Sequence, residues 1–175
     1  RLQGDWSSDV CSSDLGYLIL KTRYPTCYQD ITIVFNDVDT VPYKHIFNYR
    51  TVHGIVKHMY GFTYALGGIV TITGGDFEAS GGFPNFWGWG MEDYVFQKRC
   101  EKISLTIDRN QFRDLGDPDI LHMFDGISRI VNPKESEKVK HNTYSDNIHH
   151  ISELQFQTEE LDRKSTRLNS SHLVI

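Results

Sequence analysis

A continuous run of apolar, β-branched residues, ITIVF at 31–35, constrains the fold of this chain more than any other feature. It lacks the alternation of a half-exposed strand and is typical of a strand buried inside a sheet. GIVKHMY at 54–60 and IVTIT at 69–73 predict two more short strands, and 74–82 and 92–103 predict short helices. Strands mixed with short helices predict an α/β fold with a mixed sheet.

The remaining segments give weaker signals. GYLILK at 16–21 predicts the end of a helix or an entry segment, SLTID at 104–108 a strand, and 109–119 a loop. Residues 132–147 are polar and predict a mobile stretch, and 148–156 predict a final strand.

The sequences at both ends of the chain indicate an origin different from that of the residues between them. DWSSDVCSSDL at 5–15 is the translation of a DNA string that resembles a sequencing adapter, and its reverse complement encodes DRKSTRLNSSH at 162–172. We therefore predict that residues 1–15 and 162–175 are adapter-derived and that 16–161 are natural protein.

Composition excludes several function classes. The chain carries a formal net charge of −5, whereas nucleic-acid binding needs a basic face. No stretch of 16–161 approaches the roughly 18 apolar residues of a membrane helix. Cys27 and Cys100 lack the spacing of a metal site, so we expect free thiols in the core.

Asp37-Val38-Asp39 follows the predicted buried strand directly. Open α/β sheets bind ligands where their strands end. Carboxylate oxygens suit hard cations such as Mn²⁺ or Mg²⁺. A solvated turn with local hydrogen bonds is the alternative interpretation.

GGFPNFWGWGMED at 81–93 combines large aromatic rings with glycines and ends in Glu92 and Asp93. Glycines on both sides of Trp89 grant backbone freedom, which suits a loop that moves an aromatic face over a ligand. Indole faces and carboxylates together favour a sugar ligand. The alternatives are an aromatic core and, for the two acids, charge compensation at a helix N-terminus.

Taken together, these motifs resemble one family. The sequences FNDVDTVP, YALGGIVTITGGDFEASGGFPNFWGWGMEDYVFQKR and ILHMFDGISR are similar, in order and spacing, to the C-terminal part of the β-1,4-galactosyltransferases. The likeness spans about residues 16–156, and WGWG followed by Glu-Asp is its most specific element. It implies the C-terminal portion of a GT-A fold and an inverting, metal-dependent glycosyltransferase.

The resemblance also implies roles for single residues. Asp39 matches a metal ligand, Asp37 its support on the nucleotide side, and His122 with Met123 the second metal-binding segment. Phe124 stands where some members have a second histidine, so the third ligand stays open.

The remaining implied roles concern the two sugars. Gly67 and Gly68 match the pair that lets the donor sugar approach, and Trp89 the loop tryptophan that contacts donor and acceptor. Glu92 and Asp93 match the acceptor-binding acids, and Asp93 falls at the general base.

The implied reaction transfers galactose or N-acetylgalactosamine from a UDP-sugar to a glycan hydroxyl with inversion, using Mn²⁺ or Mg²⁺. The rival is a non-catalytic carbohydrate-binding relative. A hydrolase fits less well, because adjacent Glu92 and Asp93 cannot flank one bond from both sides.

Three departures from the family qualify this interpretation. Tyr94 replaces a third loop acid, and Ala65 stands where many members have a tyrosine beside the donor sugar, which predicts tolerance of an N-acetylated donor. Thr32 and Thr51 stand where vertebrate relatives have a disulfide.

The resemblance bears on location and completeness as well. Family analogy implies the Golgi membrane, whereas loss of the disulfide also allows the cytosol. The first half of a GT-A domain, with any membrane anchor, is expected upstream of Gly16, so we expect no turnover by this fragment alone.

Overall fold

The computed structural model describes residues 9–84, 90–123, 137, 139–140, 147–151 and 173–174. In chain order the elements are α1 (Asp9–Arg23), η1 (Tyr28–Asp30), β1 (Thr32–Asn36), β2 (Thr40–Pro42), β3 (Ile55–Tyr60), β4 (Ile69–Thr73), α2 (Gly74–Ser80), α3 (Glu92–Lys102), β5 (Thr106–Asp108), β6 (Ile120–His122), η2 (Ile148–His150) and β7 (Leu173–Val174).

The main sheet is mixed, as the sequence predicts. Its strand order is β5-β3-β4-β1-β7. The strands β1 and β3 both run antiparallel to β4, whereas β5 pairs in parallel with β3, and β7 with β1. β1 and β4 therefore lie inside the sheet, which is why their sequences are almost continuously apolar.

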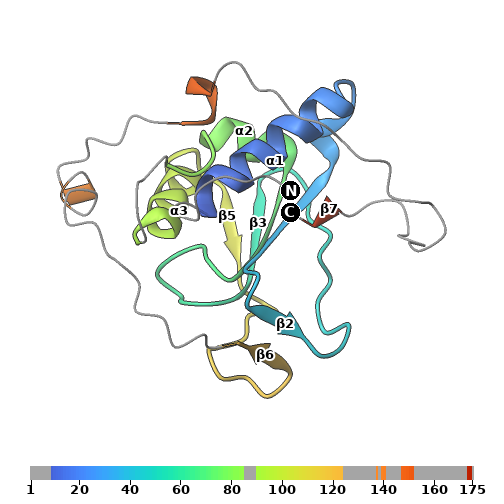
Figure 1. Cartoon of the computed structure of the whole chain (residues 1–175), viewed down its shortest axis with the longest axis vertical. Coiled ribbons are helices and arrows are strands. Elements are labelled where there is room, and N and C mark those ends of the chain that lie inside the picture. The colour runs from blue at the N-terminus through green and yellow to red at the C-terminus, as the bar shows by residue number, and fades with distance from the viewer. Residues whose placement is uncertain are drawn as a thin grey trace.

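A second, two-stranded sheet pairs β2 with β6 in antiparallel orientation. In Figure 1 it lies at the bottom of the view, away from the three α-helices. Neither strand is predicted from the sequence, because each has three residues and the ladder includes Pro42.

The main core joins the helices to one face of the sheet. Buried side chains of α1, α2 and α3, among them Tyr17, Phe77 and Phe96, pack with Ile33 and Phe35 of β1. The other face carries a smaller cluster, Phe47, Met59, Tyr60, Ile69 and Ile120. Because Ile120 belongs to β6, this cluster holds the small sheet against the large one.

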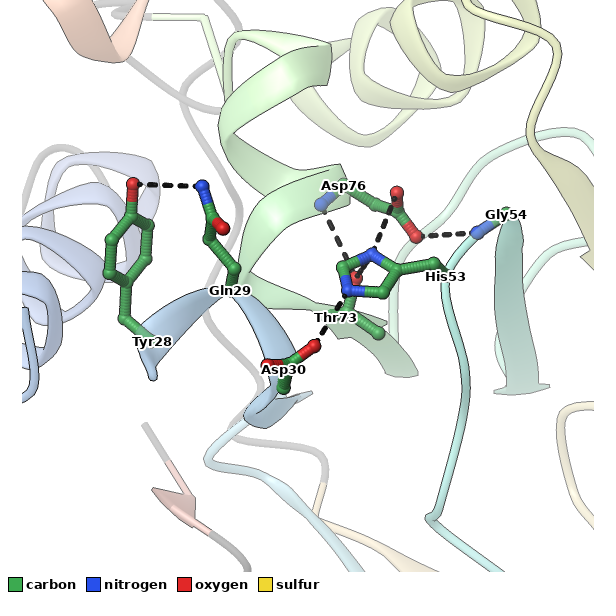
Figure 2. Close-up of polar contacts among 7 residues, drawn as sticks. All are labelled: Tyr28, Gln29, Asp30, His53, Gly54, Thr73 and Asp76. Carbon is green, nitrogen blue, oxygen red and sulfur yellow. Dashed lines mark hydrogen bonds and ion pairs between the residues drawn. The ribbon is translucent and has the colours of Figure 1, made fainter. Parts of the chain in front are cut away.

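Local signals explain the short helix α2. It begins after Thr73, whose Oγ1 accepts a hydrogen bond from the Asp76 backbone N–H at 3.3 Å. Asp76 Oδ2 accepts from the Gly54 N–H at 2.8 Å, and His53 lies between Asp76 and Asp30 (Figure 2). The β1–β4 register, with Thr32 opposite Thr73 and Asn36 opposite Ile69, puts this polar cluster at the end of the sheet remote from the Asp37–Asp39 turn.

Most elements predicted from the sequence are confirmed: the strands near 31–35, 54–60, 69–73 and 104–108, and the helices near 16–21, 74–82 and 92–103. The strand predicted over 148–156 is wrong for Ile148–His150, which form a 3₁₀ helix capped by Asn147. Cys100 is buried as expected, but Cys27 is exposed, because it lies in the surface turn between α1 and η1.

The two chain ends also contribute regular structure. Residues 9–15 form the first part of α1, and β7 pairs with β1. The adapter origin of these ends stays a prediction. Among the residues that the structure describes, no helix has both the length and the apolar character needed to cross a membrane.

Candidate active site

The Asp37–Asp39 turn is built immediately after β1. The Asp37 N–H donates to the Gly68 carbonyl at 2.9 Å, and the Thr40 N–H closes the turn by donating to the Asp37 carbonyl at 3.0 Å. Asn36 Nδ2 donates to the Asp37 and Thr40 carbonyls at 2.7 and 2.8 Å. Asn36 was not identified from the sequence. The signal that could have identified it is an amide side chain at the boundary between a strand and a turn.

Pairing of β2 with β6 brings the two predicted metal ligands together. Thr40 lies opposite His122, so Asp39 and His122 become neighbours although they are far apart in sequence. Asp39 Oδ2 lies 3.6 Å from His122 Nε2. The Met123 N–H also donates to the Asp39 carbonyl at 2.7 Å, which extends the ladder past the end of β6.

Tyr60 orients the His122 ring. Its hydroxyl lies 3.0 Å from His122 Nδ1, and its side chain is buried at the end of β3. Burial raises the pKa of Tyr60. Its neutral hydroxyl can accept a hydrogen bond from the Nδ1–H of His122, and in that tautomer Nε2 carries no proton and can act as a ligand. The other ring nitrogen, Nε2, is then left toward Asp39. This orienting contact was missed from the sequence, because only the fold brings residues 60 and 122 together.

Asp39 and His122 can supply two of the ligands of one divalent cation. A cation about 2.1 Å from each ligand atom can bridge a separation of this size, and an oxygen with an imidazole nitrogen suits Mn²⁺. Within the part of the chain that the structure describes, no group of three His, Cys, Asp or Glu side chains forms a metal site. Met123 is half-exposed, and its soft thioether suits a hard cation poorly.

Gly67 places its bare backbone against Asp93. A Cβ built on Gly67 would overlap Asp93 Oδ2 and would lie 2.7 Å from Cγ, so no side chain fits while the carboxylate stays in place. The Leu66 N–H donates to the Asp93 carbonyl at 3.2 Å. The predicted donor-side glycine and the predicted general base are therefore in contact.

Position 68 requires glycine for a different reason. Its φ of +78° lies in the left-handed region. An added Cβ would also overlap the Tyr60 carbonyl oxygen.

The two acids at the start of α3 are presented by an unusual turn. Gly90 has φ +119° and Met91, a non-glycine residue, has φ +73°. Glu92 Oε2 accepts a hydrogen bond from the Gly90 N–H at 2.8 Å. Glu92 is thus partly engaged in shaping the loop, whereas Asp93 faces Gly67. A left-handed non-glycine residue of this kind often marks a functional site.

Two predicted residues remain. Ala65 is buried, two positions before Gly67, and its N–H donates to the Phe62 carbonyl at 3.2 Å. Trp89 lies outside the described residues, which stop at 84 and resume at 90. The roles assigned to all these residues stay predictions.

The predicted site residues that the structure describes are linked by a continuous series of contacts along one edge of the main sheet. Gly68 contacts the Asp37 turn, Gly67 contacts Asp93, and Tyr60 contacts both Gly68 and His122. The two acidic corners, 37–39 and 92–93, are therefore joined through the Gly67–Gly68 turn. This arrangement puts one carboxylate beside a histidine and another beside the backbone of Gly67.

Comparison with known proteins finds a family match that includes most of these site residues. Residues 49–123, which include Tyr60, the glycine pair, Asp93 and His122, match the family described as the N-terminal domain of galactosyltransferase. Over this segment the chain is similar to the galactosyltransferases, which supports the resemblance to the β-1,4-galactosyltransferases. It is 30% identical over 125 residues to xylosylprotein 4-β-galactosyltransferase of Caenorhabditis elegans, a match that covers 61% of this chain and 41% of that protein.

A second relative is similar over a shorter stretch. β-1,4-galactosyltransferase 4 of Mus musculus is 33% identical over 108 residues, which is 55% of this chain and 30% of the mouse protein. The chain thus spans less than half of the length of the curated relatives that it matches.

Solved structures show the GT-A type fold. A point variant of Drosophila β-1,4-galactosyltransferase 7, in complex with manganese, UDP-Gal and xylobiose, aligns with a TM-score of 0.57 at 19% identity, over 73% of this chain and 58% of that one. The catalytic domain of the same Drosophila enzyme with xylobiose aligns with a TM-score of 0.51 at 18% identity, over 73% and 74% of the two chains.

Proposed function

We propose that this chain carries the acceptor side and part of the metal side of a galactosyltransferase active site. The observation that carries the proposal is the contact of Asp93 with Gly67, joined through Gly68 to the turn that holds Asp39 beside His122. The reaction would transfer galactose, or N-acetylgalactosamine, from a UDP-sugar to a carbohydrate hydroxyl.

In this proposal, each side chain has one task. Asp39 and His122 would hold a divalent cation, Mn²⁺ or Mg²⁺, which when bound would neutralise charge on the diphosphate. Tyr60 keeps the His122 ring turned toward Asp39. Asp93 accepts the proton of the acceptor hydroxyl as that oxygen attacks the anomeric carbon, and attack opposite the departing UDP inverts that carbon.

Support for the substrates comes from the relatives. The nematode protein is named a xylosylprotein galactosyltransferase, and the Drosophila structures hold UDP-Gal and xylobiose. We therefore propose UDP-galactose as donor and a xylose-containing glycan as the first acceptor to test. Ala65 is a small side chain two positions before the donor-side glycine, where many family members have a tyrosine, and we propose on this ground that an N-acetylated donor is tolerated.

The test measures UDP release with Mn²⁺ and a panel of pentose and hexose acceptors that includes xylobiose. It uses the 175-residue chain and, because a GT-A domain is expected to continue upstream of Gly16, a chain extended by the upstream reading frame. UDP-galactose is compared with UDP-N-acetylgalactosamine. Sugar-dependent UDP release supports the proposal. Affinity for the acceptor without UDP release from any donor would instead support a carbohydrate-binding relative.

Substitution of the base gives the sharper result. Asp93→Asn should lower transfer by about 10²- to 10⁴-fold, because general-base catalysis is typically worth that much, while Mn²⁺ affinity stays parental. Asp114→Asn, the same change at an exposed loop aspartate, is the matched control and should leave the rate unchanged. A parental rate in Asp93→Asn would refute the base assignment.

A further inference from the structure

His58 is a buried titratable side chain that the proposed mechanism does not use. It lies on β3, is 0% exposed, and its ring meets the Phe112 ring edge-on with centroids 4.8 Å apart. A histidine is costly to bury unless its polar atoms are satisfied. The hydrogen-bond partners of its two ring nitrogens therefore show which segments His58 connects.

Arg109 determines which nitrogen carries the proton. Arg109 Nε lies 3.1 Å from His58 Nδ1 and, as part of a guanidinium, can only donate. Nδ1 must therefore accept, and the hydrogen of the neutral ring is on Nε2. Burial, with the Arg109 charge facing the ring, lowers the pKa of His58 to about 4, so the ring is neutral at neutral pH.

The Nε2–H group serves two backbone carbonyls at once. It lies 3.0 Å from the Tyr60 oxygen and 3.0 Å from the Gly67 oxygen. These two carbonyls come from the two ends of the 61–67 loop, where the chain folds back on itself. A Cβ on Gly61 would lie 2.7 Å from the Gly67 oxygen, so the approach is close. A shared donor offsets the repulsion between the two oxygens.

Arg109 extends the same network to the helix that carries Asp93. Its Nη2 donates to the Thr63 carbonyl at 2.7 Å and to Gln97 Oε1 at 3.1 Å. Gln97 lies in α3, one turn after Asp93, and Thr63 lies in the middle of the 61–67 loop. One guanidinium therefore ties together the histidine, the loop and the helix.

We propose that His58 is a positioning residue that holds the Gly67–Gly68 turn against the Asp93 carboxylate through one N–H shared by two carbonyls. The inference rests on the proposed function for its catalytic consequence. His58 contacts no reacting group. It acts through Gly67, whose Cα sets where the carboxylate can lie.

The test compares three variants with the parent. His58→Phe keeps the ring volume and removes the donor, whereas His58→Gln keeps an N–H for the carbonyls and an oxygen for Arg109. His53→Gln changes an exposed histidine at the opposite end of the sheet and is the matched control. We expect kcat to fall about 100-fold in His58→Phe, the effect of misplacing a reacting group by about 1 Å, with the donor KM within about threefold. His58→Gln should recover most of kcat, and His53→Gln should be parental.

The pH–rate profile separates a positioning role from a merely structural one. The acid limb of the pH–rate profile should shift in His58→Phe, because the surroundings of Asp93 change. If folded His58→Phe retains parental kcat and an unshifted acid limb, the proposal is overturned.

If His58→Phe does not fold, Arg109→Gln takes its place. Nitrogen NMR of the parent should show the proton on Nε2, which faces the two carbonyls. Arg109→Gln should lower kcat, because it removes the guanidinium that joins His58, the 61–67 loop and α3. A proton on Nδ1 in the parent, or parental kcat in Arg109→Gln, would overturn the proposal equally.

A readout without turnover keeps this proposal distinct from the proposed function. The carboxyl carbon resonance of Asp93 is titrated in parent and His58→Phe, and we expect different midpoints. If the parent transfers no sugar, the proposed function fails, while a shifted Asp93 midpoint still supports the positioning role. Identical midpoints would overturn it even in an active enzyme.

Discussion

Replacing Gly67 by alanine tests the geometry of the site with a single methyl group. Gly67 does not have a left-handed φ, so its backbone accepts alanine without strain. The effect of the change is therefore steric. The added Cβ would overlap Asp93 Oδ2 and lie 2.7 Å from Cγ. Ordinary carbon contacts are about 3.5–4.0 Å, so the carboxylate must move by about 1 Å or more.

The expected magnitudes follow from what has to move. Overpacking costs about 1–3 kcal/mol, and we expect about 1 kcal/mol here, because a side-chain carboxylate can rotate away more easily than backbone. Activity should suffer more than stability. A misplacement of about 1 Å can cost about 100-fold in rate, so Gly67→Ala should lose transfer while remaining folded.

A double-mutant cycle isolates the contact. Parent, Gly67→Ala, Asp93→Ala and the double variant are unfolded in urea, and transfer is measured at saturating donor. With Asp93 truncated to alanine, the nearest atom to the new methyl group is the Cβ of residue 93, 3.4 Å away, so the change should cost little. We expect a coupling free energy of about 1 kcal/mol. Additivity within about 0.5 kcal/mol, with parental transfer in Gly67→Ala, would refute the reasoning. Gly75→Ala, inside α2, is the control and should transfer normally.

Two further predictions concern single contacts. Tyr60→Phe removes the hydroxyl that lies 3.0 Å from His122 Nδ1, so Mn²⁺ affinity followed by electron paramagnetic resonance should fall about 10- to 100-fold; unchanged affinity would mean that Tyr60 does not orient a metal ligand. Asp14 is fully buried, and burial raises its pKa to about 7. Because the folded state then binds the proton more tightly than the unfolded state, this carboxyl costs stability as pH rises from 3.8 to about 7. Asp14→Asn should be more stable than the parent at pH 8, by up to about 4 kcal/mol, and should differ little at pH 4; equal urea midpoints at both pH values would show that Asp14 is not buried as the structure has it.

The predictable part of the fold is the part with long local signals. The runs that became β1 and β4 are largely apolar and rich in β-branched residues, and β3 begins with Ile55 and Val56. The helix α3 has acids in its first turn and Arg99 and Lys102 in its last. Such signals act within five to eleven residues, so they survive without knowledge of the rest of the chain.

The unpredicted part is the part that brings the site residues together. β2 and β6 have three residues each, too few for a periodic pattern, yet their pairing puts Asp39 beside His122. The contact of Tyr60 with His122 depends on the same kind of long-range placement. The contact of His58 with Gly67 depends on how the loop between them folds back. No local pattern marks a residue that acts through another element.

The amino-acid sequence by itself determined which chemical groups this protein carries: two acidic corners, a glycine pair and a histidine, with the strands and helices on which most of them lie. Only the tertiary structure decided that these groups meet along one edge, that Asp93 lies against Gly67, and that His58 and Tyr60 support them. The physical reason is that residue type and short-range periodicity are local properties, whereas distances between segments come from packing of the whole sheet and its helices.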